Sequence, residues 1–376
     1  MNRTITISLA LSLSGCNFFS ALTGGMGAGA EGAAFAMDME KYDVKSIDFA
    51  FAGNDGTFCP GEDYSFVVTA QATKKKKPGQ LLTLETAVPG ASAKDNRGKM
   101  DLTDFAMEGR SGTVSHGVFT ADADPFMSLL GFDVRATYRL DKTKKVEHHF
   151  DPVYSCIQSV GSSGSRGQEG EGGDPGSEDG AGGGAAAPGG QGKAGPRVVA
   201  YVTIVRTPKH ERVGMVQVTG DVEQLTLFDL ATGITVAARG GEGGYGGRGG
   251  DGADGSDPQG AGGPGGPGGT GGPGGDGGEA IVVLDQRYPE LGSIVDVDVS
   301  GGAPGPGGDG GNGGDGGDAP PKACDDCERG DPGPDGTDGT NGTPGTSEGR
   351  PGRSEVNAKD VSSTFASLPP GVRLLD

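Results

Sequence analysis

Apolar and polar residues alternate in short stretches along positions 38–160. Turn-forming Asn, Gly and Pro separate these stretches at intervals typical of a β-sandwich. The expected strands are residues 44–51, 64–69, 81–88, 114–120, 132–139 and 146–153. About 120 residues suffice for one hydrophobic core. We therefore expect residues 38–160 to form one antiparallel β domain.

A second group of short, β-branched stretches follows, and Gly, Pro or charged residues bound each of them. The expected strands lie within 197–238 and 280–300, at residues 197–205, 213–218, 225–230, 234–238, 280–284 and 294–299. Apolar residues alternate with polar ones in several of them, so half of each such strand is expected to be exposed. These strands predict a β platform that glycine-rich segments leave and rejoin.

Glycine recurs at every third residue in six runs that fill most of residues 161–352. We number them runs 1 to 6: residues 161–176, 180–195, 240–255, 260–278, 301–317 and 330–345. A period of three matches a polyproline-II-type helix, which rises ~3.1 Å per residue, so each run would be a rod about 50 Å long. Short joints couple runs 1 and 2, 3 and 4, and 5 and 6 into three hairpins.

Glycine spacing divides the runs into two kinds. Runs 3, 4 and 5 contain Gly-Gly-X repeats at 240–250, 262–277 and 307–317, whereas runs 1 and 6 are mostly Gly-X-Y. A doubled glycine leaves a rod bare on two faces, which lets several neighbouring backbones approach it. The sequence therefore predicts a mainly β fold in which short strands brace a polyglycine-II bundle, with the Gly-Gly-X rods inside and runs 1 and 6 at its edge.

Two alternatives exist for the glycine-rich half. Such compositions often stay disordered, which would make residues 161–352 a flexible spacer. A collagen-like triple helix of three chains needs glycine only at one position in three. Runs of about five triplets are short for collagen, and β-rich segments interrupt them.

The first residues have the features of an export signal. A weakly basic start precedes ten apolar residues, 4–13, which are too few to span a bilayer as a helix. The following Leu13-Ser14-Gly15-Cys16 resembles a bacterial lipoprotein signal. That resemblance implies that residues 1–15 are removed, that Cys16 is lipidated and that residues 16–37 form a flexible tether. Because Asn17 rather than Asp follows the cysteine, it also favours the outer membrane of the bacterial cell envelope.

One part of the first domain resembles a known family. The segment SGTVSHGVFTA at 111–121, followed by VRATY at 134–138, is similar to the bacterial Ig-like group 2 pattern. The match covers about 30 residues. It implies an Ig-like β-sandwich with a spacer or adhesive role, and no catalytic residues accompany it.

The chain has five cysteines, and an even four remain once Cys16 carries lipid. In an exported protein such cysteines usually pair, so we expect Cys59 to bond Cys156 and Cys324 to bond Cys327 in the joint between runs 5 and 6. As a zinc site the latter pair lacks two further ligands, and acidic neighbours disfavour a redox-active thiolate.

The formal net charge of −20 disfavours nucleic-acid binding, which starts from basic surface. Asp296 and Asp298 share a strand face and could bind Ca²⁺ with Asp309 or Asp315, although a solvated acidic face is the simpler interpretation. No catalytic or cofactor-binding spacing is evident, and residues 353–376 are expected to be a tail. These observations predict a non-enzymatic, lipid-anchored protein with a structural or adhesive role. The alternative is a ligand-binding protein for polysaccharide, Ca²⁺ or a protein partner.

Overall fold

The computed structural model describes residues 37–54, 56–92, 94–322 and 331–375. It is mainly β, with several antiparallel sheets and only short 3₁₀ helices among the described residues. Contacts divide the chain into two compact units, one ending at Val153 and the other starting at Tyr154. The division precedes residue 160 because β9 (Ser159–Ser163) pairs with a strand of the second unit.

The first unit contains two antiparallel sheets. One consists of β1 (Tyr42–Phe51), β2 (Asp63–Lys74), β3 (Lys77–Glu85), β5 (Gly112–Ser115) and β6 (Val118–Ala121). The other consists of β4 (Phe105–Arg110), β7 (Phe132–Tyr138) and β8 (Lys145–Phe150). Both sheets contribute to one core that is rich in phenylalanine, including Phe51, Phe66, Phe119 and Phe132. This arrangement is consistent with the expected β-sandwich.

The single strand expected at residues 114–120 is wrong, because this segment forms a hairpin. β5 ends at Ser115, β6 begins at Val118, and these two residues pair directly. The turn residues His116 and Gly117 have φ angles of 49° and 79°. Positive φ at both central positions is the geometry of tight β-hairpin turns. Val114 and Val118 lie an even number of residues apart, as in one continuous strand, so the hydrophobic pattern did not reveal the turn.

The second unit contains two groups of parallel strands. β9, β13 (Ile234–Arg239) and β15 (Val295–Asp298) form a three-stranded sheet. In the six-stranded sheet, β10 (Arg197–Arg206), β14 (Glu279–Asp285) and β16 (Arg353–Lys359) are parallel, and β11 (Val213–Gly220), β12 (Gln224–Phe228) and β17 (Arg373–Leu374) complete it. Buried valine, isoleucine and leucine from both sheets form a second core.

The expectation that residues 353–376 are a tail is wrong. β16 pairs with β14 from Arg353 opposite Glu279 to Lys359 opposite Asp285. β17 pairs with the end of β10. β16 has only one large apolar residue, Val356, so its sequence shows no hydrophobic alternation. Almost all of the strand is exposed, and Val356 itself is 54% exposed. The unpaired edge of β14, rather than the composition of the segment, makes it a strand.

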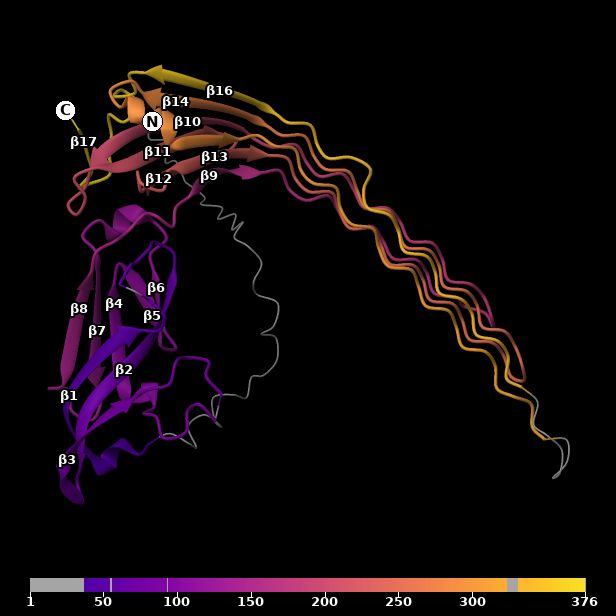
Figure 1. Ribbon diagram of the computed structural model, residues 1–376, viewed down its shortest axis with the longest axis horizontal. Helices are drawn as coiled ribbons and strands as arrows, with labels where there is room; N and C mark the ends of the chain where they lie inside the picture. The colour runs from indigo at the N-terminus through magenta and orange to yellow at the C-terminus, as the bar shows by residue number, and fades with distance from the viewer. Residues whose placement is uncertain (1–36, 55, 93, 323–330, 376) are drawn as a thin grey trace, which may run out of the picture. The chain divides into compact units, whose positions relative to one another are not determined.

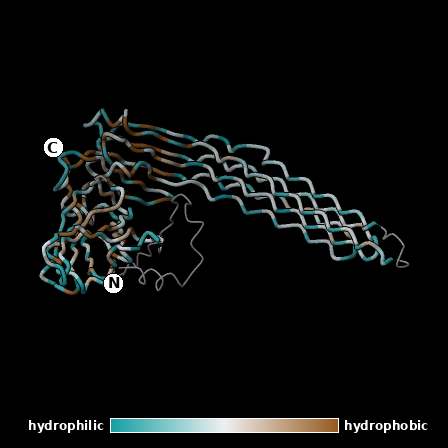
Figure 2. The backbone as a smooth tube through the Cα atoms, turned by 60° about the horizontal axis from the view of Figure 1, so that its bottom comes forward, coloured by the Kyte–Doolittle hydropathy of each residue, from teal (hydrophilic) through white to brown (hydrophobic). Residues whose placement is uncertain are grey.

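Each pair of glycine runs joins one strand group to the other. β9, β13 and β15 lead into runs 1, 3 and 5, while runs 2, 4 and 6 lead back into β10, β14 and β16. Figure 1 shows the runs side by side as they leave these strands, and Figure 2 shows apolar strands giving way to pale and hydrophilic runs. The parallel strands therefore set the order in which the runs begin and end.

Candidate functional site

Backbone hydrogen bonds join alternate runs into two layers. In the first layer, Gly170 of run 1 donates to Tyr245 of run 3 (2.8 Å), and Gly246 of run 3 donates to Pro306 of run 5 (3.0 Å). The same pattern repeats every third residue along these runs. In the second layer, run 2 donates to run 4 and run 4 to run 6, as from Gly268 to Thr340 (2.9 Å). The layers are thus runs 1, 3 and 5, and runs 2, 4 and 6.

A second set of bonds crosses between the layers. At one level these bonds form a chain through all six runs: Gly342 to Gly308, Gly308 to Gly269, Gly269 to Gly247, Gly247 to Ala187 and Ala187 to Glu171, at 2.8–3.0 Å between N and O. Runs 3 and 4 consequently bond to four neighbours each, runs 2 and 5 to three, and runs 1 and 6 to two.

The neighbour count explains where glycine is doubled. A Cβ at Gly266 in run 4 would overlap the carbonyl of Gly184 in run 2, and one at Gly265 would overlap that of Gly311 in run 5. Both positions of the Gly-Gly pair therefore face a neighbouring backbone. The third residue of the triplet, such as Pro267, is exposed. Runs 1 and 6, with two neighbours, need glycine only once per triplet.

Acidic and amide side chains bond amides that backbone carbonyls do not reach. Asp338 and Asp335 of run 6 accept from the N–H groups of Gly313 and Gly316 in run 5, at 3.0 and 2.9 Å. In run 3, Asp251 accepts from the N–H of Asn312 at 2.7 Å. Some of the many acidic side chains of this chain therefore act as hydrogen-bond acceptors for backbone amides of neighbouring runs.

The two outer faces of the bundle differ in charge. On the layer of runs 1, 3 and 5, Arg166 pairs with Glu242 and lies 5.1 Å from the centre of the Tyr245 ring, and Arg248 pairs with Asp251. The corresponding residues of runs 2, 4 and 6 are mostly neutral: Ala185, Pro188, Pro264, Pro267, Thr270, Pro273, Thr337, Thr340 and Thr343.

A pocket of about 630 Å³ lies where β10, β14 and β17 end, away from the runs. Its lining includes Arg206, Glu211, Arg212, Tyr288, Arg373 and Leu375. Three arginines around one pocket are unusual in a chain of net charge −20. The pocket is at the carboxyl ends of parallel strands, where open sheets commonly place ligands.

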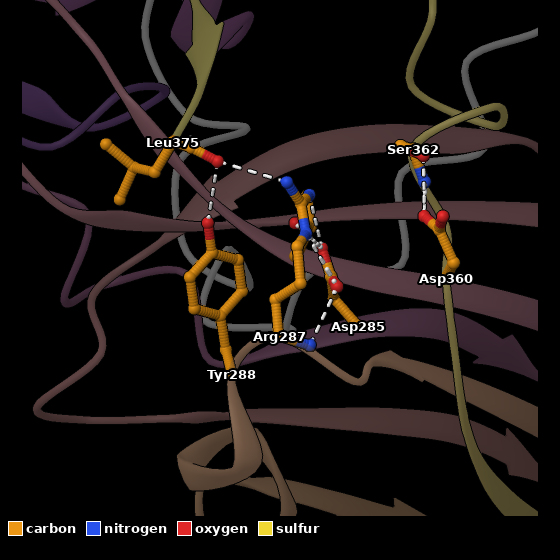
Figure 3. A network of polar contacts seen from close by, with 7 residues as sticks. Asp285, Arg287, Tyr288, Asp360, Ser362 and Leu375 are labelled. Atoms are coloured by element: carbon orange, nitrogen blue, oxygen red, sulfur yellow. Dashed lines mark hydrogen bonds and ion pairs between the residues drawn. The ribbon is translucent and has the colours of Figure 1, made fainter.

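A buried ion pair lies beside two residues of the pocket lining, Tyr288 and Leu375. Asp285 is 1% exposed, accepts from Thr203 Oγ1 at 2.7 Å and pairs with Arg287 Nη2 at 2.7 Å. Arg287 Nη1 and the Tyr288 hydroxyl both donate to the carbonyl oxygen of Leu375, at 3.1 and 3.0 Å (Figure 3). These bonds hold the last described residues against the pocket.

The pKa values of this group follow from its contacts. Burial alone raises the pKa of Asp285, but hydrogen bonds from Arg287 and Thr203 outweigh it and hold the pKa below its ordinary value. The bond to Asp285 raises the pKa of Arg287, and burial raises that of Tyr288. The pair Asp285–Arg287 is therefore charged at neutral pH.

The predicted site residues have different outcomes. The disulfide between Cys59 and Cys156 is confirmed. Cys16, Cys324 and Cys327 lie outside the described residues. Asp298 accepts from Arg239 Nε at 2.6 Å and from the N–H of Ser300 at 2.9 Å. Within the described ranges, no group of three or more His, Cys, Asp and Glu side chains is placed to hold a metal ion.

Sequence reasoning missed the arginine-lined pocket. Arg206 directly follows the strand expected at 197–205. Arg373 belongs to a segment expected to be a tail, and nothing in the chain signals that β17 joins β10. Within the part of the chain that the structure describes, no helix is long and apolar enough to cross a membrane. Searches against known protein families, curated proteins and solved structures found no match to this chain.

Proposed function

We propose that this chain is a non-enzymatic lipoprotein of the bacterial cell envelope with a structural or adhesive role. The carrying observation is the continuous backbone network of the six runs. Bending the bundle would break many hydrogen bonds together, each contributing about 0.5–1.5 kcal/mol. Such a unit is suited to holding surface groups at a fixed distance from the sheets rather than to enclosing a substrate.

In this proposal the six runs are polyglycine-II-type helices. Their period of three, the bonding of every third amide and the exposed third residue all support this geometry. Donors and acceptors belong to one chain, which disfavours a collagen-like triple helix. The first unit would be an Ig-like spacer, since its two antiparallel sheets share one core.

Lipid anchoring at Cys16 is the part of the proposal that determines where in the cell the protein is located. Cells that express the chain should incorporate labelled palmitate into it and retain it in the outer-membrane fraction, whereas the Cys16→Ala variant should take up no label. Cys59→Ser serves as a control, because it also removes a cysteine, one half of the Cys59–Cys156 disulfide, but leaves the signal intact. Label in the Cys16→Ala protein would refute the lipoprotein hypothesis.

The structural or adhesive role is tested on the same cells. Attachment to surfaces and leakage of periplasmic markers are compared for cells with wild-type protein, with Cys16→Ala protein and without the gene. We expect Cys16→Ala to behave like the deletion even when the exported variant melts like the wild type. Normal attachment and an intact envelope in the deletion strain would contradict the proposal.

A ligand-binding function is the second candidate, and the arginine-lined pocket favours it. The pocket has a volume of about 630 Å³, within the range of small-ligand sites, and a hydrogen bond joins two of its lining residues, Tyr288 and Leu375.

A further inference from the structure

Two arginines lie side by side on the lining of the pocket. β10 and β17 are antiparallel, and Arg206 is directly opposite Arg373 in their register. Residues paired in this way have Cβ atoms about 5 Å apart on the same face, and like charges there are destabilising. The arrangement is therefore unfavourable unless negative charge lies between the two side chains.

Carboxylates form ion pairs with two of the three arginines that line the pocket. Glu211 pairs with Arg206 at 2.7 Å, but its side chain is 82% exposed. Glu290 pairs with Arg212. Arg373 has no ion pair or side-chain hydrogen bond with any residue that the structure describes. Among residues 37–54, 56–92, 94–322 and 331–375, none therefore occupies the N–H donors of this guanidinium on the lining of the pocket.

The chemistry of the lining selects the ligand. Guanidinium groups present paired N–H donors that match the oxygens of carboxylate and phosphate. A cationic pocket in an otherwise acidic chain concentrates anions locally. Its volume of about 630 Å³ exceeds what a bare inorganic ion needs and lies within the ~300–1,000 Å³ of small-molecule sites. Tyr288 and Leu375 add apolar surface beside the cations.

Two lining residues, Tyr288 and Leu375, are held in place by hydrogen bonds to each other and to Arg287. Arg287 is held by Asp285 on one side and by the Leu375 carbonyl on the other, and its guanidinium carbon lies 5.4 Å from the centre of the Tyr288 ring. A site whose walls are already fixed spends less free energy on ordering when a ligand binds.

We propose that this pocket binds a carboxylate or phosphate group carried by a ligand of sugar size, with Arg206 and Arg373 holding the anionic oxygens. The ligand class is an acidic saccharide, in which a uronate or a sugar phosphate supplies the anion. Tyr288 would contact its less polar body. This inference does not depend on the lipid anchor or on the role of the bundle.

Isothermal titration calorimetry on the purified full chain tests the proposal. The titrants are trigalacturonate, glucose 6-phosphate and neutral maltotriose, each at low and at high salt. We expect at least one of the two anionic ligands to bind and maltotriose not to bind. Affinity should fall as salt is raised, because exposed charge attraction is screened. Binding of only one anionic ligand identifies carboxylate or phosphate as the recognised group.

Two variants and a matched control complete the experiment. Arg373→Gln and Arg206→Gln should each weaken binding about tenfold or more, since each removes charge-assisted hydrogen bonds to the anion. Arg353→Gln also removes an exposed arginine, but from the start of β16 at the opposite end of the sheet, and should bind as the wild type does. Circular dichroism melts establish that each variant is folded. Failure of both anionic ligands to bind, equal binding of maltotriose, or equal weakening by Arg353→Gln would overturn the proposal.

Discussion

At the residue scale, glycines in the runs differ from their neighbours by what a side chain would touch. A Cβ at Gly268 would overlap the carbonyl of Gly308 in run 5, and the Gly268 amide donates to Thr340 in run 6. Thr270, two residues later, is exposed. Two positions in the same run therefore lie in opposite environments.

We expect Gly268→Val to destabilise the second unit strongly. The valine must push run 5 away, and each buried hydrogen bond lost costs about 1–3 kcal/mol. In a unit of this size each kcal/mol lowers the melting temperature by about 2–4 °C. Thr270→Val is the matched control and should stay within about ±0.5 kcal/mol. Thermal melts of both variants measure the difference, and equal melts would contradict the interior placement of Gly268.

The buried carboxylate of Asp285 should make stability depend on pH. Its pKa in the folded state is lower than in the unfolded chain, so its contribution is complete above the unfolded value of about 3.9 and is lost as pH falls through the folded value. Asp285→Asn leaves Arg287 unpaired beside the pocket. We expect it to cost roughly 2–3 kcal/mol at pH 7 and less at pH 3.

Urea denaturation at both pH values measures this effect. Asp309→Asn is the control, because that aspartate is exposed in run 5 and has no described side-chain bond. A cost for Asp285→Asn that is the same at pH 7 and pH 3 would show that its charge does not matter.

At the scale of elements, side chains of one run complete the hydrogen bonding of the next. The backbone network leaves some amides of run 5 without a carbonyl, and Asp335, Asp338 and Asn341 of run 6 accept from them at intervals of one triplet. Edge runs can therefore carry side chains that contribute directly to packing. Their Gly-X-Y pattern reflects both fewer neighbours and this added role.

We expect Asp338→Ala to loosen the contact between runs 5 and 6 locally. The Gly313 amide would lose its acceptor, which costs about 0.5–1.5 kcal/mol and should speed its hydrogen exchange about threefold to tenfold. Asp338→Asn keeps the carbonyl oxygen and should exchange almost as the wild type does. Thr337→Ala removes an exposed neighbouring side chain and should have no effect. Unchanged exchange at Gly313 in Asp338→Ala would exclude this bond.

At the scale of the whole molecule, the glycine amides of runs 3 and 4 find their acceptors within the same chain, so no second chain is needed to pair them. We therefore expect the Cys16→Ala form to sediment as a single species with the mass of one chain, 37.4 kDa before removal of the signal. A triple helix would give three times that mass. Circular dichroism in parallel should show a cooperative transition, which a disordered spacer would lack. A trimeric species would refute the bundle.

The mainly β class, most strands and the six runs can be inferred from the sequence alone, as can the difference between runs 3, 4 and 5 and runs 1 and 6. These features depend on local periodicity: alternation with period two predicts a strand, and glycine with period three predicts a polyproline-II-type helix. Each can be recognised without knowing what lies beside it. The pairing of Cys59 with Cys156 is predicted from the even number of cysteines in an exported chain.

Which elements are neighbours is a property of the folded chain. The order of the parallel strands sets the order of the runs, and this order places charged residues such as Glu242 and Arg248 on one face and Pro267 and Thr340 on the other. β16 and β17 are strands because an open sheet edge accepts them, and β17 brings Arg373 opposite Arg206. Such contacts cannot be predicted from the spacing of residues along the chain, because they join residues that are far apart in sequence.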